Sequence, residues 1–170
     1  MISSQNKLIL KNESTPIIED TCNCRNRSKC PLEGKCSAAG IVYQAKVTRA
    51  DNHHEETYVG LADTTFKERY GNHKHSFKEK RKKAATTLSQ YIWSLKEKKV
   101  AYTITWKIIA RAKSYSTNTG KCSLCLKEKY FIICRRDMAS LNKRDELTSV
   151  CRHRKKHLLC NMKYACMRSL

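Results

Sequence analysis

Four cysteines lie within 15 residues of one another near the start of the chain, in the segment TCNCRNRSKCPLEGKCS: Cys22, Cys24, Cys30 and Cys36. The segment holds few apolar side chains, so it has little material for a hydrophobic core of its own. A tetrahedral Zn²⁺ ion closed by four thiolates would order such a segment. We therefore expect residues 21–37 to bind structural zinc, although the Cys-x-Cys spacing is tighter than that of the usual zinc knuckle.

The remaining cysteines point to a second metal site. The chain has ten cysteines, and its first residues, MISSQNKLILKNESTP, lack the apolar centre of a secretory signal. We therefore expect a reducing, intracellular setting, which favours metal ligands or buried thiols over disulfides. Cys122 and Cys125 have knuckle spacing, and Cys151 with His153 or His157 would complete a second zinc site. The alternative is that Cys125 packs as a small apolar side chain. Three cysteines stay unassigned: Cys134, Cys160 and Cys166.

The charge of the chain predicts a polyanionic partner. There are 35 lysines and arginines against 15 aspartates and glutamates, which gives a net charge of +20. Such a charge repels itself in the folded state and is tolerated when nucleic acid is the partner. The alternatives are a solvated basic surface or a basic arm that binds a membrane surface. No apolar run approaches the roughly 20 residues that a membrane span requires.

Composition divides the chain into four parts. Residues 1–20 are polar and predict a flexible leader. The cysteine-rich segment 21–37 follows, and 38–150 form one domain. Residues 151–170 carry six Lys or Arg and no acid, so we expect a basic, partly mobile tail that contains Cys and His.

Hydrophobic periodicity predicts three strands within the domain. GIVYQAKVTR alternates as a strand does, and TYVGLA is a second β-prone run that ends at Gly60. The polar stretch ADNHHEE between them predicts an antiparallel hairpin with a long loop. AYTITWKIIA is the third strand. Two sets of residues are expected to share a face in their strands: Ile41, Tyr43, Ala45 and Val47, and then Tyr102, Ile104, Trp106 and Ile108.

Two capping boxes and one apolar segment predict three helices. Thr65 with Glu68 opens the first helix, and Thr87 with Gln90 opens the second. The segment CSLCLKEKYFIIC is the third. The expected buried stripes are Phe66, Tyr70 and Phe77 in the first helix, and Leu88, Ile92 and Leu95 in the second. The order β-β-α-α-β-α predicts an α/β fold with a three-stranded antiparallel sheet flanked by helices.

Several short motifs occur in a recognisable order. GIVY occupies 40–43, YVG occupies 58–60, Arg69 follows on the first helix, Glu128 lies on the third, and LNKR contains Asn142. In these residues the chain resembles the GIY-YIG endonuclease superfamily over roughly residues 40–145. The flanking blocks CNCRNRSKCPLEGKC, CSLCLKEK and CRHRKKHLL are similar to the endonuclease domains of Penelope-like retroelements. The chain departs from the motif in Val59, and 14 residues separate Tyr43 from Tyr58 in a loop that includes His53 and His54.

The resemblance implies a metal-dependent endonuclease that hydrolyses DNA phosphodiester bonds. It implies that Glu128 holds Mg²⁺ or Mn²⁺, that Arg69 contacts the scissile phosphate, and that the motif tyrosines and the final Asn belong to the site: Tyr43, Tyr58 and Asn142. Helical spacing places Glu128 one turn from Leu124 and Ile132, on the core side, although it could instead be a rim carboxylate paired with Lys. Arg69 could likewise be an ordinary surface arginine.

The general base has two candidates. Tyr43 would need help to accept a proton near neutral pH, because a phenol has a pKa of about 10. His73 lies one turn beyond Arg69 and titrates near neutrality. A hydrogen bond at the edge of the core would equally explain His73.

Three functional hypotheses follow. The first is a nuclear enzyme that nicks target DNA for a retroelement and works with a reverse transcriptase of the same element. The second is a catalytically inactive, zinc-stabilised nucleic-acid-binding module. The third is an adaptor that binds proteins through zinc knuckles, which leaves the charge and the motif residues unexplained. The sequence does not predict an oligomeric state.

Overall fold

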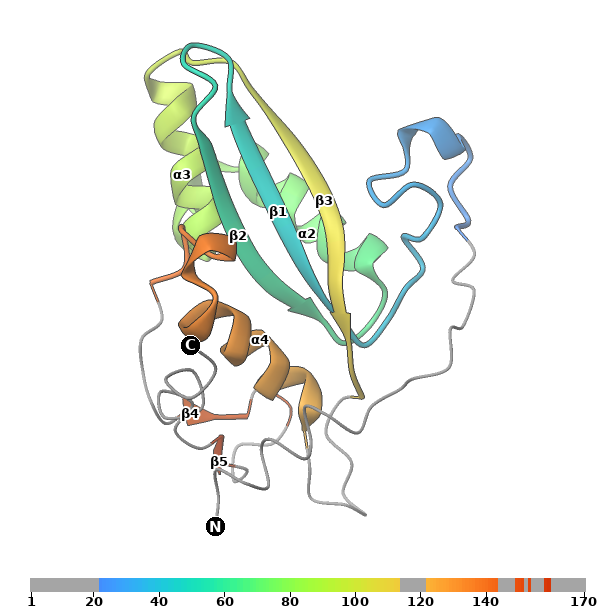
Figure 1. The fold of residues 1–170 in the computed structure, drawn as a ribbon. Helices are drawn as coiled ribbons and strands as arrows, with labels where there is room; N and C mark the ends of the chain where they lie inside the picture. The colour runs from blue at the N-terminus through green and yellow to red at the C-terminus, as the bar shows by residue number, and fades with distance from the viewer. Residues whose placement is uncertain (1–21, 114–121, 144–148, 152, 154–157, 160–170) are drawn as a thin grey trace.

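The computed structural model describes residues 22–113, 122–143, 149–151, 153 and 158–159. These residues form a three-stranded antiparallel sheet with helices on both faces, as the sequence predicts (Figure 1). The leader 1–20 and most of the tail 151–170 lie outside the described residues. None of the described helices is long and apolar enough to cross a membrane.

The sheet has the order β2-β1-β3, with β1 (Ile41–Arg49) in the centre. β2 (Glu55–Ala62) and β3 (Tyr102–Arg111) both pair with it antiparallel. The β1–β2 connection is shorter than the sequence predicts, because pairing begins at Glu55, which forms an ion pair with Lys46 at 2.8 Å. β2 also continues past Gly60, where the prediction ended it.

β1 is buried on both faces, and not only on the face that alternation predicts. Ile41, Tyr43, Ala45 and Val47 are fully buried on one face, but Val42 and Gln44 on the other face are buried as well. This second burial follows from a helix that covers the opposite side of the sheet. The partner positions on β3 are only partly buried because β3 is an edge strand.

α2 (Phe66–Lys78) and α3 (Thr87–Glu97) cover one face of the sheet, behind it in Figure 1. Thr65 caps α2 as predicted, since its side chain accepts the backbone N–H of Glu68. The predicted cap of α3 is wrong by one residue. Thr86, in extended backbone conformation, accepts the N–H of Ser89. The 3₁₀ helix η2 (Lys80–Ala85) connects the two helices.

α4 (Ser123–Cys134) packs on the other face. Its Leu124 and Ile132 form a second buried cluster with Val42, Val59 and Leu61 of the sheet. The short helix η3 (Arg136–Met138) follows α4. Elsewhere in the described chain lie the short helix η1 (Arg27–Lys29) and the paired strands β4 (Ser149–Val150) and β5 (Leu158–Leu159).

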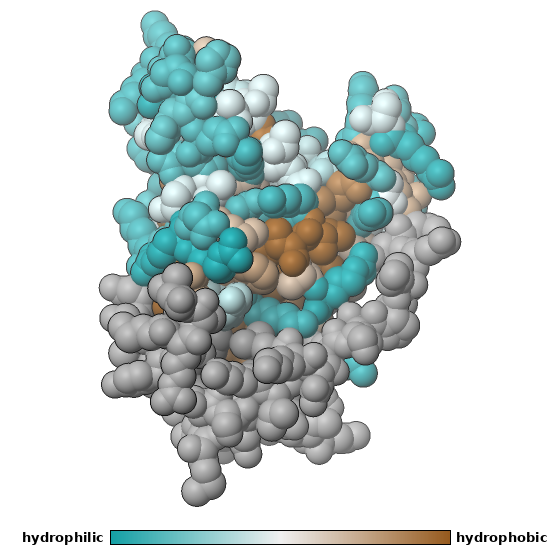
Figure 2. All heavy atoms as spheres, in the orientation of Figure 1, coloured by the Kyte–Doolittle hydropathy of each residue, from teal (hydrophilic) through white to brown (hydrophobic). Residues whose placement is uncertain are grey.

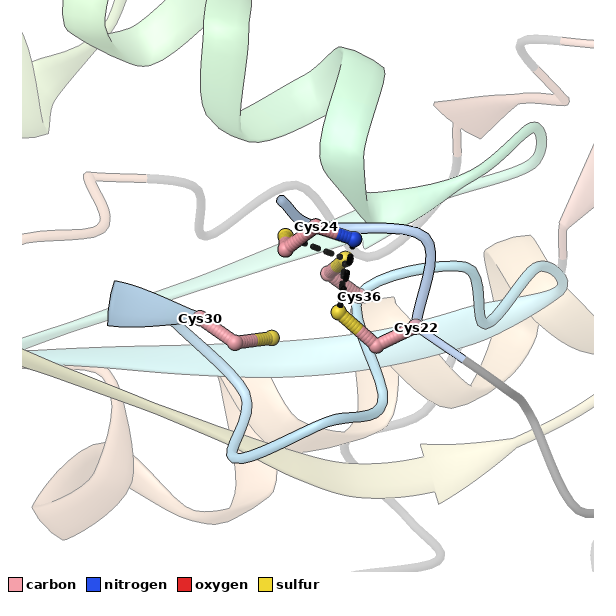
Figure 3. A group of neighbouring side chains, drawn as sticks. All are labelled: Cys22, Cys24, Cys30 and Cys36. Atoms are coloured by element: carbon pink, nitrogen blue, oxygen red, sulfur yellow. Dashed lines mark hydrogen bonds between the residues drawn. The ribbon is translucent and has the colours of Figure 1, made fainter. Parts of the chain in front are cut away.

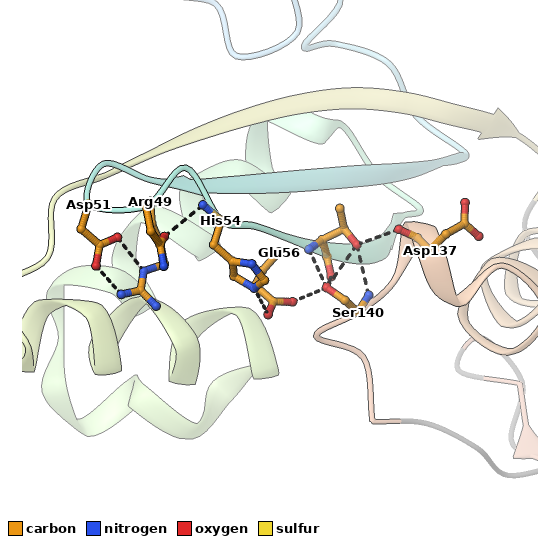
Figure 4. Close-up of polar contacts among 8 residues, drawn as sticks. Arg49, Asp51, His54, Glu56, Asp137 and Ser140 are labelled. Atoms are coloured by element: carbon orange, nitrogen blue, oxygen red, sulfur yellow. Dashed lines mark hydrogen bonds and ion pairs between the residues drawn. The ribbon is translucent and has the colours of Figure 1, made fainter.

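The segment after η3 runs along the outer edge of β2 (Figure 4). The backbone N–H of Leu141 donates to the carbonyl of Thr57 at 2.8 Å. The hydroxyl of Ser140 accepts the N–H of Thr57 at 2.8 Å and contacts the carboxylate of Glu56. The edge that would otherwise expose unpaired backbone groups is therefore covered here.

Candidate functional site

Tyr43, His73 and Arg69 form a continuous series of hydrogen bonds. The Tyr43 hydroxyl lies 2.7 Å from Nε2 of His73, and Nε–H of Arg69 donates to the same hydroxyl at 3.1 Å. Tyr43 comes from the central strand, whereas Arg69 and His73 stand one turn apart on α2. Tyr43 is fully buried, His73 is 3% exposed, and Arg69 is half-buried. Of these three residues, Arg69 is the one that reaches solvent.

The environment defines the protonation states of this series. Burial, with Arg69 as the second cause, lowers the pKa of His73 to about 3. Burial also raises the pKa of Tyr43 above its usual value, with a further rise from Tyr58, although Arg69 opposes this. At neutral pH His73 is therefore neutral, and its Nε2 can accept the hydrogen bond of the Tyr43 hydroxyl, which itself accepts from Arg69.

The two motif glycines are required by close contacts. A Cβ atom on Gly60 would lie 2.5 Å from the hydroxyl oxygen of Tyr43, so the phenol of Tyr43 occupies that space. Gly40 has φ +59°, and a Cβ there would lie 2.6 Å from the carbonyl oxygen of Ala112. The absence of a side chain at Gly60 on β2 therefore leaves room for the phenol of Tyr43, which reaches over from β1.

Tyr58 and Glu128 lie close to this series. Tyr58 is 7% exposed, and its ring centroid lies 5.9 Å from that of His73. Glu128 is 2% exposed on the inner side of α4, so it is not a rim carboxylate. Its charge is near enough to contribute to the raised pKa of Tyr43. Glu128 is thus a buried carboxylate on α4, in the layer of the fold opposite to α2.

Asn142 acts on the second motif through the backbone. Its Oδ1 accepts the N–H of Val59 at 2.8 Å, and its Nδ2 donates to the carbonyl of Val59 at 2.9 Å. An amide that pairs with both backbone groups of one residue replaces the neighbouring strand that an edge residue lacks. Asn142 therefore positions Tyr58 and Gly60, which flank Val59.

The first cysteine cluster has the geometry of a metal site (Figure 3). The Sγ atoms of Cys22, Cys24, Cys30 and Cys36 all lie within 4.8 Å of one another. Two of these pairs, Cys24–Cys36 and Cys22–Cys36, are 3.4 Å apart. Sulfurs around tetrahedral zinc, with Zn–S bonds of about 2.3 Å, stand about 3.8 Å apart. The cluster could therefore hold a structural metal ion such as zinc.

The thiols of this cluster differ in pKa, and therefore in how readily they form the thiolate that binds a metal. Burial alone would raise the pKa of Cys30, but hydrogen bonds from the backbone of Leu32 and Gly34 lower it to about 6. Burial and the Cys24 thiol raise the pKa of Cys36. A metal ion at the centre of the cluster would lower the pKa of these thiols, because a metal binds the thiolate form and releases the proton.

The cysteine-rich segment also caps the helix that carries Arg69 and His73. The carbonyl of Ala38 accepts the N–H of Phe66, and the carbonyl of Cys36 accepts the N–H of Lys67, both at 2.8 Å. These two N–H groups belong to the first turn of α2, whose donors have no partner within the helix. The first cluster therefore supports the orientation of α2.

The second cluster brings together the ligands expected from far apart in the sequence: Cys122, Cys125, Cys151 and His153. Nδ1 of His153 lies 3.4 Å from the sulfur of Cys122, 3.3 Å from that of Cys125 and 3.8 Å from that of Cys151. These spacings fit tetrahedral zinc. Cys125 also packs in the apolar cluster under α4, so both interpretations of it apply. The alternative ligand His157 lies outside the described residues.

Asp63 completes the second cluster and was not expected from the sequence. Its carboxylate lies 3.3 Å from Nε2 of His153, the ring nitrogen that faces away from the sulfurs. A carboxylate in this position fixes the tautomer and orientation of a metal-binding histidine. Nothing in the sequence marks Asp63, since 90 positions separate it from His153.

Cys134 differs from the expectation of reduced thiols, because it is disulfide-bonded. The other two unassigned cysteines, Cys160 and Cys166, lie outside the described residues. His53 and His54 are exposed in the β1–β2 connection, where His54 pairs with Glu56 at 3.0 Å. They take no part in the hydrogen-bonded series of Tyr43.

In comparisons with protein-family models, curated proteins and solved structures, the chain matches none. The likeness to GIY-YIG endonucleases therefore rests on the motif residues and on their arrangement in this chain. It remains an interpretation.

Proposed function

We propose that the chain is a GIY-YIG-type endonuclease that uses a divalent metal ion to hydrolyse DNA phosphodiester bonds. The observation that carries the proposal is the hydrogen-bonded series of Arg69, Tyr43 and His73, together with the buried carboxylate of Glu128 on α4. The net charge of +20 supports a polyanionic substrate.

Each residue supplies a type of group that the reaction needs. Tyr43, whose hydroxyl is held by His73 and Arg69, would be the general base for the attacking water once bound metal and substrate have lowered its pKa. Arg69 is half-buried and permanently charged, so it would contact the phosphate while it stabilises the deprotonated phenol. The raised pKa of Tyr43 without substrate indicates that its deprotonation requires added positive charge.

The catalytic metal would be held by Glu128. A carboxylate oxygen is the ligand type that Mg²⁺ or Mn²⁺ takes, together with waters and a substrate phosphate. When bound, the ion would polarise the phosphoryl group and lower the pKa of groups around it. A single acidic ligand predicts weak metal binding in the absence of DNA.

The cellular role follows from the resemblance. We propose that the enzyme nicks target DNA in the nucleus for a Penelope-like retroelement, and that a reverse transcriptase of the same element uses the exposed end. The structural zinc sites would keep the domain folded while the divalent ion takes part in the reaction.

The experiment is cleavage of supercoiled plasmid by the purified chain in Mg²⁺. Glu128→Ala is expected to abolish cleavage and to leave DNA binding within about twofold, because binding comes from many lysines and arginines spread over the surface. Glu97→Ala is the matched control, since Glu97 is an exposed carboxylate on α3 paired with Lys83. Cleavage at the wild-type rate by Glu128→Ala would exclude this site.

A second candidate function is a catalytically inactive, zinc-stabilised nucleic-acid-binding module. Burial favours it, because Tyr43 is fully buried and His73 is 3% exposed, so water reaches neither without movement of the surrounding residues. In that case the same plasmid would bind but remain uncut, with Mg²⁺ or with Mn²⁺.

A further inference from the structure

A cavity lies between the cysteine-rich segment and β3, on the edge of the sheet away from β2. Its volume is about 340 Å³. β3 is an edge strand, so this side of the sheet is not paired with another strand. None of the residues assigned to catalysis or to the metal clusters lines this cavity. The lining residues come from two parts of the chain: Leu32, Glu33 and Lys35, and then Trp106, Lys107, Ile108 and Arg111.

The cavity combines an apolar surface with a basic rim. Trp106 and Ile108 are both partly exposed, and Figure 2 shows hydrophobic side chains at the surface between the sheet and the cysteine-rich segment. Lys35 and Lys107 are exposed, and with Arg111 they outnumber the one carboxylate, Glu33. The volume is near the lower end of the small-ligand range, about 300–1,000 Å³, and therefore suits one compact ligand.

We propose that this cavity binds one unstacked nucleotide of a single nucleic-acid strand. A base is flat and apolar on its faces, which suits the indole of Trp106, and its phosphates suit Lys35 and Lys107. An extended acidic peptide would satisfy the lysines but would leave the indole without a matching planar group. A duplex keeps its bases stacked, so it cannot place one against Trp106. The proposal rests on nucleic acid being the partner, as the proposed function holds.

The cavity is joined to the catalytic residues through one side chain. The ring centroid of Trp106 lies 5.8 Å from that of Tyr43 and 5.3 Å from that of His73. A base in contact with Trp106 would therefore lie one side chain away from the hydrogen-bonded series. The subsite would hold a single-stranded part of the substrate beside the reacting duplex.

Intrinsic fluorescence tests the proposal. The chain has two tryptophans, and Trp93→Phe leaves Trp106 as the only one, which is excited selectively at the red edge of absorption, where tyrosine does not absorb. Titration of this variant with a 10-nucleotide oligo-dT should quench the emission, with the same Kd that the anisotropy of a fluorescein-labelled oligo-dT reports. Circular dichroism checks the fold of the variant, because Trp93 donates one hydrogen bond to the carbonyl of Ser76.

Charge variants locate the binding. In the Trp93→Phe background, Lys35→Ala with Lys107→Ala should weaken oligo-dT binding about tenfold and reduce the slope of log Kd against log salt by about 1.4, since each phosphate contact contributes about 0.7 for a single strand. The control pair is Lys82→Ala with Lys98→Ala, two exposed lysines on η2 and after α3. It should leave the quenching amplitude unchanged.

Each other outcome overturns the proposal. If oligo-dT binds by anisotropy but Trp106 is not quenched, the strand lies elsewhere, and nucleic-acid binding stands without this subsite. Equal quenching by a duplex of the same length, or by poly-glutamate, would show a general anion groove. If no oligonucleotide binds, the subsite and the proposed partner are both wrong, whereas failure of plasmid cleavage alone would leave the subsite intact.

Discussion

Protonation of His73 is expected to destabilise the protein in mild acid. Burial, with Arg69 as the second cause, lowers the pKa of His73 in the folded protein to about 3, from 6.5. The unfolded chain therefore binds one more proton between these two values, so stability is full above about pH 6.5 and decreases as pH falls towards 3. At about 1.4 kcal/mol per pKa unit the whole shift amounts to at most about 5 kcal/mol.

The test is urea denaturation of wild type and His73→Gln at about pH 7.5 and about pH 5. Over this interval wild type should lose about 2 kcal/mol through His73, because about 1.5 pKa units of the shift fall within it. Glutamine does not titrate, and its amide oxygen can accept the hydrogen bond of Tyr43 at a similar place. Acid also weakens metal binding to the cysteine clusters, but it does so in both proteins, so the difference isolates His73.

His75→Gln is the matched control. His75 is exposed on the same helix, two positions along. This variant should lose as much stability as wild type between the two pH values. If His73→Gln also loses as much as wild type, His73 is not held neutral in the folded protein, and its role as acceptor for Tyr43 must be abandoned.

Three further predictions concern the active site and the second metal cluster. Arg69→Lys should be inactive in plasmid cleavage, because an ammonium group cannot hold the Tyr43 hydroxyl and the phosphate together. Near-normal activity of this variant would refute the role of Arg69. Gly60→Ala should cost about 1–3 kcal/mol in thermal or urea unfolding through its clash with Tyr43, whereas Gly71→Ala, in open space on α2, should not destabilise. Asp63→Asn should weaken zinc binding about 10- to 100-fold in a competition assay with a chromogenic chelator, and unchanged affinity would show that it does not orient His153.

Local patterns predicted most elements of the fold, because each depends on residues close together in the sequence. Thr65 caps α2 through a residue three positions away, and Leu88, Ile92 and Leu95 form the buried stripe of α3. The three strands alternate on the face that α2 and α3 cover. These features follow from helical and strand periods, which a short window of sequence contains in full.

The rest depended on contacts between distant segments. Alternation in β1 did not predict that Val42 and Gln44 would also be buried, since that burial needs α4 on the second face. The edge of β2 is covered by residues more than 80 positions away, through Asn142. Thr86 caps α3, and Thr87 does not, because Thr86 has the extended backbone conformation of a cap. Two adjacent threonines look alike in the sequence, so the sequence could not predict which one has it.

The sequence predicted which residues lie in the candidate site, but not the hydrogen bonds that join them. Helical spacing placed Arg69 and His73 on one face of α2, and the order of motifs selected Tyr43. The sequence offered Tyr43 and His73 as rival bases, whereas the structure joins them at 2.7 Å. The two candidates therefore share one hydrogen bond, and His73, with its pKa lowered to about 3, is the weaker base of the two.

Both cysteine clusters contact the connection between β2 and α2, the helix that carries Arg69. The first cluster contributes the carbonyl of Cys36 to the cap of α2, beside that of Ala38, and the second contacts Asp63, just before that helix, through His153. Arg69 stands in the first turn of the helix so held, and its distance to Tyr43 depends on where that helix begins. Loss of a metal ion held by either cluster would therefore be expected to displace Arg69 relative to Tyr43. Structural zinc would then act on catalysis through the position of one guanidinium group, although neither cluster takes part in the reaction.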